Sequence, residues 1–229
     1  PRISAQFTFS YKSLDEKDKA AYNRLYDHFF YHRHNDFWYG QAMQKLPPLV
    51  SSTQMLVCGE DLGMIPSCVP QVMKELQILS LEIQRMPKET DKLFENLGTL
   101  PYLSVCTTST HDMSPIRGWW KENEKNTQRY YNDILWKQGE APEDCSPELC
   151  ELILRNHLYS PAMLAIIPLQ DWLSINDKLR RRNPDDERIN IPAVSQHYWR
   201  YRMHLSLEQL IQENDFNKKI QNLLKDSWR

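Results

Sequence analysis

Two acidic motifs, each placed directly behind an apolar run, hold the residues of this chain whose types are most suited to chemistry. In CGEDLGMIP, Glu60 and Asp61 follow the apolar run Met55–Cys58, and in STHDMSPIRGWW, His111 and Asp112 follow YLSVCT. A carboxyl group at the mouth of an apolar core is partly desolvated, which raises its pKa and lets it hold a proton near neutral pH. We therefore expect Glu60 to act as a general acid.

Asp112 supplies the second carboxyl group, two predicted strands after Glu60. A pair of carboxylates on one face of a sheet suits sugar chemistry, because a positively charged oxocarbenium ion develops there and must be stabilised. His111 would donate a hydrogen bond to a sugar hydroxyl. Trp119, just beyond a strand-end loop, would offer a flat apolar face to a pyranose ring.

Structural and metal-binding interpretations of the same residues stay open. Glu60 or Asp61 would equally cap the helix that follows, because helix N-termini attract anions. His111 would then be a structural histidine, and most of the seven tryptophans would belong to the core. The two motifs together could also ligate a metal in a hydrolase, although metallohydrolases usually supply several histidines.

Composition excludes several classes of protein. The 229 residues carry a formal charge of -2, so no basic field attracts nucleic acid. No apolar run approaches the ~20 residues that cross a bilayer, and no signal peptide opens the chain, which favours a soluble protein. The five cysteines match no zinc or disulfide pattern, which favours the reducing cytoplasm. Cys58 and Cys106 are expected inside apolar strands as inert thiols, and no cofactor is expected.

Helices are expected before the first motif. Apolar residues at three- and four-residue spacing predict a helix over Leu14–Tyr31, with Ser13 as N-cap and Glu16 completing a capping box. A second helix is predicted over about residues 35–45, where Pro47 and Pro48 would end it. The domains are accordingly a helical segment over 1–50 and a strand-containing part over 51–229.

Four apolar strands, at about residues 55, 80, 104 and 165, alternate with helical sequence. Uninterrupted apolar strands separated by helices predict an α/β fold with a parallel sheet buried on both faces. In a TIM (β/α)8 barrel the chemistry follows the strands, as both motifs do here. Four strands predict the C-terminal half of such a barrel, strands 5–8, with extra helices. After them, KLRRRNPDDERINIPAVSQ is expected to be a solvated loop with local ion pairs, and a closing helix is expected over about 206–225.

Several motifs in order make a resemblance specific. CGEDLGMIP, STHDMSPIRGWW, AIIPLQDWL and INIPAVSQHYWRYR, with YHRHNDFWYGQAMQKLPPLV and LEIQRMP, resemble the amylomaltase or disproportionating-enzyme family of 4-α-glucanotransferases, glycoside hydrolase family 77. The resemblance runs nearly the whole length and is strongest to the maltose-using cytosolic type. It implies a (β/α)8 barrel and a retaining transfer of α-1,4-glucosyl units between maltose or malto-oligosaccharides and glucan acceptors.

The resemblance also implies roles for individual residues. Glu60 corresponds to the general acid/base, Asp112 to the carboxylate that stabilises the transition state, and His111 to a residue that binds a sugar hydroxyl. Asn190 in INIP and Asp61 would contact substrate, as would Trp119. The family glycine after INIP is Ala193 here. Gln170 and Asp171 match a family pair whose roles we leave open.

The nucleophile of the family is an aspartate in an arginine-x-aspartate-histidine context, and this segment does not occur here. Asp27 and His28 are adjacent but fall in the middle of a predicted helix. A chain that starts at Pro1 is then expected to be the C-terminal part of a longer enzyme and to be inactive alone. The two exposed strand edges of a half barrel favour a homodimer. The competing interpretation is a noncatalytic module that binds or scaffolds α-glucan.

Overall fold

The computed structural model describes residues 4–63, 65–89, 91–197 and 199–229. They divide into two compact units, of which the first extends to Ser80 and the second runs from Leu81 to Arg229. The division falls after the predicted boundary at residue 50, because α4 (Val69–Glu75) packs with the helices of the first unit. Tyr39 donates a hydrogen bond to Glu75 of α4 at 2.9 Å.

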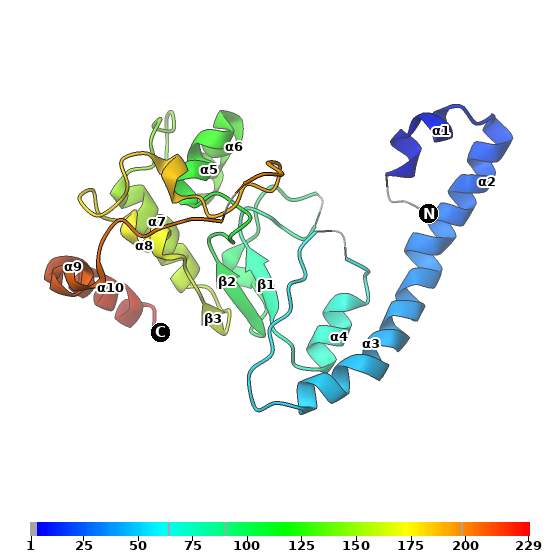
Figure 1. Ribbon diagram of the computed structural model, residues 1–229, viewed down its shortest axis with the longest axis horizontal. Helices are drawn as coiled ribbons and strands as arrows, with labels where there is room; N and C mark the ends of the chain where they lie inside the picture. Colours follow the sequence, from blue (N-terminus) through cyan, green and yellow to red (C-terminus); the bar gives the residue numbers. More distant parts are fainter. Residues whose placement is uncertain (1–3, 64, 90, 198) are drawn as a thin grey trace. The chain divides into compact units, whose positions relative to one another are not determined.

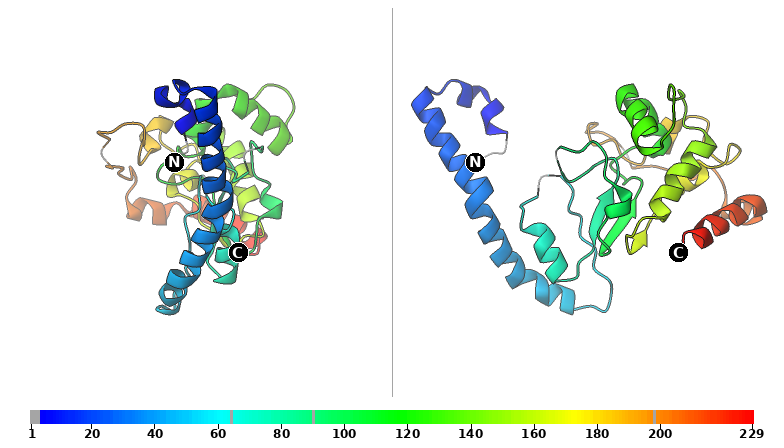
Figure 2. Two further views of the ribbon diagram at one scale, coloured as in Figure 1. Left: turned by 90° about the vertical axis from the view of Figure 1, so that its right-hand side faces the viewer. Right: turned by 180° about the vertical axis from the view of Figure 1, so that it is seen from behind.

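The first unit contains one continuous helical run, drawn in blue in Figure 1 and from two further sides in Figure 2. Two short turns, η1 (Ala5–Phe7) and α1 (Phe9–Lys12), precede it. The run then consists of α2 (Glu16–Asp27), the π-helical η2 (His28–Arg33) and α3 (His34–Ser51). The sequence predicted two separate helices here, whereas the backbone passes between them through a π-helical turn.

The ends of this helical run differ from the predicted ones. Asp15, and not Ser13, is the N-cap of α2, and its carboxylate accepts from the Asp18 amide at 2.8 Å. Pro47 and Pro48 lie inside α3 and do not end it. The φ angle of proline fits a helix and each proline removes one donor, so α3 continues to Ser51.

A three-stranded sheet of order β1-β2-β3 is formed by Ser80–Ile83, Ser104–Thr107 and Leu164–Ala165, and all of it except Ser80 belongs to the second unit. β2 pairs with β3 in parallel, with Val105 opposite Leu164, and all four residues of β2 are buried. The predicted α/β class is confirmed. The apolar run AMLAIIPL yields only two strand residues, and Ile166 directly after them is 59% exposed.

Helices cover the sheet of the second unit and supply most of its core. The segment PELCELILRNHLYS, which has apolar residues at helical spacing, forms α7 (Pro147–Leu158) and buries Leu149, Ile153, Leu154 and other residues. The other helices and turns are η3 (Leu97–Thr99), α5 (Ile116–Glu122), α6 (Glu124–Arg129), the π-helical η4 (Tyr130–Ile134), α8 (Leu169–Leu173), η5 (Pro184–Glu187), α9 (Leu207–Gln212) and α10 (Asn214–Asp226).

The C-terminal region corrects two predictions. The single closing helix is in fact α9 and α10, which are interrupted at Glu213. The arginine-rich loop is not a solvated segment with local pairs only, because Glu187 is buried and pairs with the distant Arg117. Within the described residues, none of the helices has the length and apolar character needed to cross a membrane.

Candidate active site

Glu60 and Asp61 follow a single backbone bridge. Cys58 pairs in parallel with Leu79, and the Gly59 amide donates to the Leu79 carbonyl at 2.8 Å. An added Cβ at Gly59 would lie 3.0 Å from the Met73 methyl carbon, so the Met73 side chain packs closely against this glycine. The predicted strand Met55–Cys58 is therefore wrong except at Cys58. Only one pairing partner covers this run, which leaves Met55, Leu56 and Cys58 exposed.

The structure differs from the expectation of a partly buried Glu60. Glu60 is exposed, whereas Asp61 is only 4% exposed. Successive residues of an extended chain face opposite sides, so only one of the pair can point inward. The partial desolvation expected at Glu60 is absent in this chain. The helix-capping alternative is also contradicted, because the next helix, α4, begins at Val69 with Cys68 as its N-cap.

In the second unit, His111 and Asp112, in the segment after β2, come together with Asn190, which follows η5. The Asn190 side-chain amide donates to Asp112 Oδ1 at 2.5 Å, and its backbone amide donates to the His111 carbonyl at 3.1 Å. His111 Nε2 lies 3.4 Å from Asp112 Oδ2. The side chains of His111 and Asp112 are 50% and 47% exposed, so a ligand in solution can reach both.

Trp199 is a fourth member of this cluster that the sequence analysis did not single out. Its ring lies 5.0 Å from the His111 ring, centroid to centroid, with an interplanar angle of 42°. Trp199 is 59% exposed, so it presents apolar area next to the polar atoms of His111 and Asp112. The signal in the sequence was the aromatic segment QHYWRYR, which follows INIPA.

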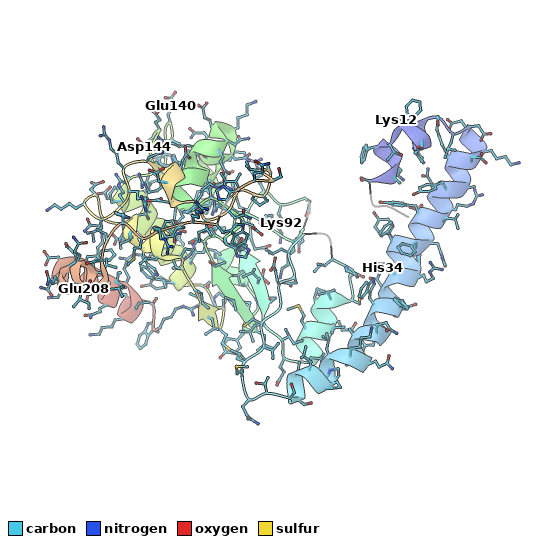
Figure 3. All side chains as sticks on the ribbon, in the orientation of Figure 1. Lys12, His34, Lys92, Glu140, Asp144 and Glu208 are labelled. Carbon is cyan, nitrogen blue, oxygen red and sulfur yellow. The ribbon has the colours of Figure 1, made fainter. Side chains whose placement is uncertain are left out.

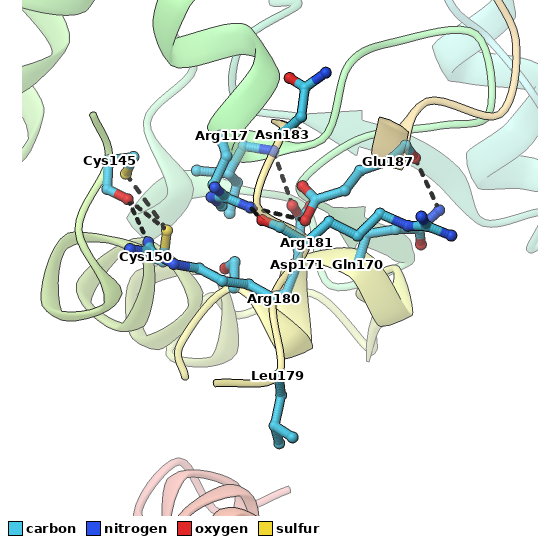
Figure 4. A network of polar contacts seen from close by, with 12 residues as sticks. Arg117, Cys145, Cys150, Gln170, Asp171, Leu179, Arg180, Arg181, Asn183 and Glu187 are labelled. Carbon is cyan, nitrogen blue, oxygen red and sulfur yellow. Dashed lines mark hydrogen bonds and ion pairs between the residues drawn. The ribbon is translucent and has the colours of Figure 1, made fainter. Parts of the chain in front are cut away.

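Polar contacts hold the segment Glu187–Asn190 in place, and those of Glu187 are drawn in Figure 4. Gln170 donates to the Glu187 carbonyl at 3.2 Å, and Arg117 pairs with the Glu187 carboxylate at 2.9 Å. Arg188 donates to the carbonyl of Asn190 through Nε at 3.3 Å and through Nη2 at 3.2 Å. Asn190 is thus presented to Asp112 by a restrained backbone.

Asp171, whose role the sequence left open, fastens both ends of the loop that carries His111 and Asp112. It is fully buried and accepts from Thr108 Oγ1 at 2.5 Å near the start of the loop, and from the Ile116 amide at 2.8 Å at its end. Burial raises the pKa of the Asp171 carboxyl group, and these hydrogen bonds oppose the rise.

Arg85 also anchors this loop, and the sequence analysis did not identify it. Its guanidinium donates to the Thr108 carbonyl at 2.7 Å and to the Ser114 carbonyl at 2.9 Å. Burial lowers the pKa of Arg85, and its enclosed Nη1 has no hydrogen-bond partner among the described residues. Arg85 and Asp171 together define the positions at which the loop leaves and rejoins the core.

Trp119 is half-buried within an aromatic group. Its ring meets Phe94 and Tyr130 edge to face, at 6.1 Å and 5.0 Å between centroids, and the Arg85 guanidinium lies 4.9 Å from its ring centre. These contacts give Trp119 a packing role beneath the loop. Its predicted contact with substrate stays a prediction.

The buried Glu187 carries a strongly perturbed carboxyl group. Burial raises its pKa to about 7, although the neighbouring Arg117 opposes the rise. Its buried Oε2 meets no hydrogen-bond partner within residues 4–63, 65–89, 91–197 and 199–229. Across the part of the chain that the structure describes, no group of three or more histidine, cysteine, aspartate or glutamate side chains is arranged to hold a metal ion.

Helices cover a small parallel sheet, so the chain is an α/β protein. A cluster of polar and aromatic side chains follows the end of one strand. Proteins of this class usually bind their ligands at the ends of the strands, so the cluster is a candidate binding site. The family model for 4-alpha-glucanotransferase, glycoside hydrolase family 77, matches residues 7–207. The chain belongs to this family.

Individual relatives support this family assignment. The 4-alpha-glucanotransferase DPE2 of Oryza sativa subsp. japonica is 40% identical over 229 residues, which is 100% of this chain and 24% of the relative. The 4-alpha-glucanotransferase of Chlamydia caviae is 30% identical over 188 residues, 80% of this chain and 34% of the relative. The chain therefore spans a quarter to a third of these relatives.

A solved structure shares the fold. The amylomaltase from Streptococcus agalactiae in complex with acarbose matches with a TM-score of 0.58 at 18% sequence identity. The match covers 81% of this chain and 34% of the amylomaltase chain. This likeness supports the α/β fold assignment.

Proposed function

We propose that this chain is the C-terminal half of the catalytic (β/α)8 barrel of a 4-α-glucanotransferase. As part of its longer parent it would transfer α-1,4-linked glucosyl units between maltose or malto-oligosaccharides and glucan acceptors, with retention of configuration. The observation that carries the proposal is the cluster of Asp112, Asn190 and His111, drawn from segments far apart in the sequence, with the carboxylate open to solvent. The family membership supports the reaction class.

Each residue of the cluster has a role in this reaction. The Asp112 carboxylate would stabilise the positive charge that develops on the sugar ring, and Asn190 fixes its orientation through Oδ1. His111 would bind a sugar hydroxyl, and the exposed ring of Trp199 offers it an apolar neighbour. Glu60 would protonate the leaving glycosidic oxygen, for which its exposed carboxyl group is accessible.

Retention requires an attacking carboxylate as well as a protonating one, about 5 Å apart. The family nucleophile motif does not occur in this sequence, and Asp27 lies at the end of α2, within the long helical run. We therefore propose that the 229-residue chain is inactive on its own. We also propose a cytoplasmic location. The five cysteines are free, and the buried Cys145 and Cys150 sulfur atoms lie 3.5 Å apart without a bond, as suits a reducing compartment.

The function is tested by substitution in the full-length parent. Asp112→Asn and Glu60→Gln should each lower glucosyl transfer from maltose to glycogen by about a hundredfold to a thousandfold, because each removes transition-state stabilisation or proton transfer. Glu140→Gln is the matched control, since Glu140 is an exposed surface residue, labelled in Figure 3, and should leave transfer unchanged.

Two outcomes would contradict the proposal. Near-normal transfer by both variants would remove Asp112 and Glu60 from the mechanism. Glycogen binding by an unsubstituted parent without any transfer would favour the noncatalytic glucan-binding module.

A further inference from the structure

A hollow of about 510 Å³ lies in the second unit, and none of the cluster residues His111, Asp112, Asn190 and Trp199 lines it. Two exposed aromatic residues, Trp136 and Tyr159, line it together with polar side chains. The polar lining includes Asn96, Asp133 and Asn156. We call this feature the Trp136 groove.

Both the solvent exposure of Trp136 and its backbone conformation are unfavourable for a tryptophan. It is 84% exposed, so its large apolar ring gains little from burial. Its φ angle is +54°, in the left-handed region where a side chain is strained and where glycine or asparagine usually ends a helix. Strained backbone is a reason to look for function, because such a residue must be supported by its surroundings.

The backbone around Trp136 is well supported. The Leu135 amide donates to the Tyr130 carbonyl at 3.0 Å, and the Lys137 amide donates to the Tyr131 carbonyl at the same distance. Asn132 donates from its side chain to the Lys137 carbonyl at 2.8 Å. The exposed ring is thus carried by a preorganised turn at the end of η4, which lowers the entropy lost when a ligand binds.

The chemistry of the groove fits a sugar chain. A pyranose ring has apolar C–H faces and a rim of hydroxyl groups. The faces of Trp136 and Tyr159 can cover the former, whereas carboxylate and amide groups such as those of Asp133 and Asn156 can pair with the latter. The wall behind them is rigid, because Phe94 packs edge to face against the buried Tyr130 at 5.0 Å.

We propose that the Trp136 groove is a secondary binding site for an α-1,4-linked glucan chain, apart from the site that carries out transfer. The assignment of the linkage rests on the proposed function. Such a site would hold a long glucan on the protein while one of its ends is processed, and would leave the reaction of short donors such as maltose unaffected.

Binding of maltoheptaose to the purified 229-residue chain, followed by calorimetry, tests the proposal. Trp136→Gly should weaken binding by about tenfold or more, because it removes the stacking face. The substitution also relieves the left-handed strain, so the variant should be at least as stable to heat as the wild-type chain. Trp136→Phe, which keeps an aromatic face, should retain most of the affinity.

Trp228→Gly is the matched control. Trp228 is likewise an exposed tryptophan, at 95%, with a positive φ of 60°, but it does not line the groove. Its loss should leave maltoheptaose binding unchanged. Tyr159→Ala is a second variant within the groove and should weaken binding as Trp136→Gly does. Cellohexaose, the β-linked analogue, should bind more weakly than maltoheptaose.

The outcomes separate this proposal from the proposed function. Unchanged affinity in Trp136→Gly, or no maltoheptaose binding by the wild-type chain, would overturn the groove and leave the transferase assignment standing. In the full-length parent, Asp112→Asn should lower transfer by about a hundredfold to a thousandfold and keep binding at the groove, whereas Trp136→Gly should keep turnover of maltose and lower the affinity for glycogen. A loss of maltose turnover in Trp136→Gly would also contradict a separate secondary site.

Discussion

Asn190 donates one amide proton to one oxygen of Asp112, and this contact determines how the carboxylate faces a ligand. In the full-length parent, Asn190→Ala should lower kcat for glucosyl transfer by about tenfold to a hundredfold, with a smaller effect on KM, because the carboxylate loses its fixed orientation. Steady-state kinetics with maltose and glycogen measures both constants. Asn214→Ala, at the exposed start of α10, is the control and should behave as wild type. A change confined to KM would mean that Asn190 only binds substrate.

Asp171 holds both ends of the loop between β2 and α5, which carries His111 and Asp112. Asp171→Asn replaces an acceptor oxygen by a donor group opposite the donors Thr108, Ser109 and Ile116. Because the site is fully buried, we expect a loss of about 2–4 kcal/mol in the free energy of unfolding. Urea denaturation measures it. Asp177→Asn, on the exposed surface, should change it by less than about 1 kcal/mol; equal effects at both positions would argue against the buried network.

Glu187 should make stability depend on pH. Its pKa rises from 4.5 to about 7 in the folded chain, so between these values the folded state keeps a proton that the unfolded state releases. The free energy of unfolding from this residue therefore falls as pH rises through that window, by about 3 kcal/mol in total. The buried His157, whose pKa is lowered to about 4, contributes in the opposite direction between about 4 and 6.5.

The difference between wild type and Glu187→Gln isolates the effect of Glu187, because His157 and Asp171 are present in both. Denaturant unfolding at several values between pH 4.5 and 7.5 should show a free energy of unfolding that rises more steeply with pH in Glu187→Gln. Parallel curves for the two proteins would mean that Glu187 is already ionised throughout this range.

At the scale of elements, the loop between β2 and α5 is the unit that carries His111 and Asp112. Arg85 fastens it through the carbonyl groups of Thr108 and Ser114. Arg85→Lys keeps the charge but provides no planar pair of donors, so it should release one end of the loop. Hydrogen exchange of amides in residues 109–114 should accelerate about tenfold or more, while the amides of α7 keep their protection. Unchanged exchange would assign the restraint to Asp171 alone.

The sequence predicted correctly those elements that are specified by their own residues and do not depend on distant contacts. The amphipathic spacing of α7 specifies its buried face, and its cap Ser146 accepts from the Leu149 amide. At α2, Ser13 and Asp15 are both suitable caps, so the sequence cannot decide between them locally. The run from Met55 to Cys58 looked like a buried strand because it is apolar, but burial requires neighbours that only the tertiary structure reveals.

The sequence predicted those residues of the candidate site that lie in recognisable motifs. Asp112, His111 and Asn190 were all identified from the sequence, and the structure brings them together. Arg85 was not, because arginine is by default a surface residue and nothing in LEIQRMP shows that its guanidinium will be enclosed. Trp199 was one of seven tryptophans, and only its ring contact with His111 distinguishes it.

At the scale of the whole molecule, we expect the isolated chain to release no glucose from maltose, because no aspartate in it stands in the nucleophile motif of the family. A coupled glucose assay on the purified 229-residue chain measures this directly. Its positive control is the full-length parent at equal concentration. Turnover by the isolated chain at the rate of the parent would show that the nucleophile lies within these residues and that the retaining assignment needs another carboxylate.

The edges of the sheet bear on assembly. β3 is a two-residue edge strand followed by the exposed Ile166, whereas Leu79, directly before β1, already pairs with Cys58. An unpaired edge favours association with a second copy. Light scattering should therefore detect a homodimer whose fraction rises with concentration. A monodisperse monomer across the accessible range would contradict this expectation.

The loop after β2 is anchored at both ends, and this affects how its sequence can diverge among members of this family. Asp171 and Arg85 bind Thr108 and Ser109 at its start and Ser114 and Ile116 at its end, and the tip, residues 110–113, lies between these anchors. Mutations at the tip can therefore accumulate without unfolding the protein, so that substrate preference can drift while the scaffold is conserved.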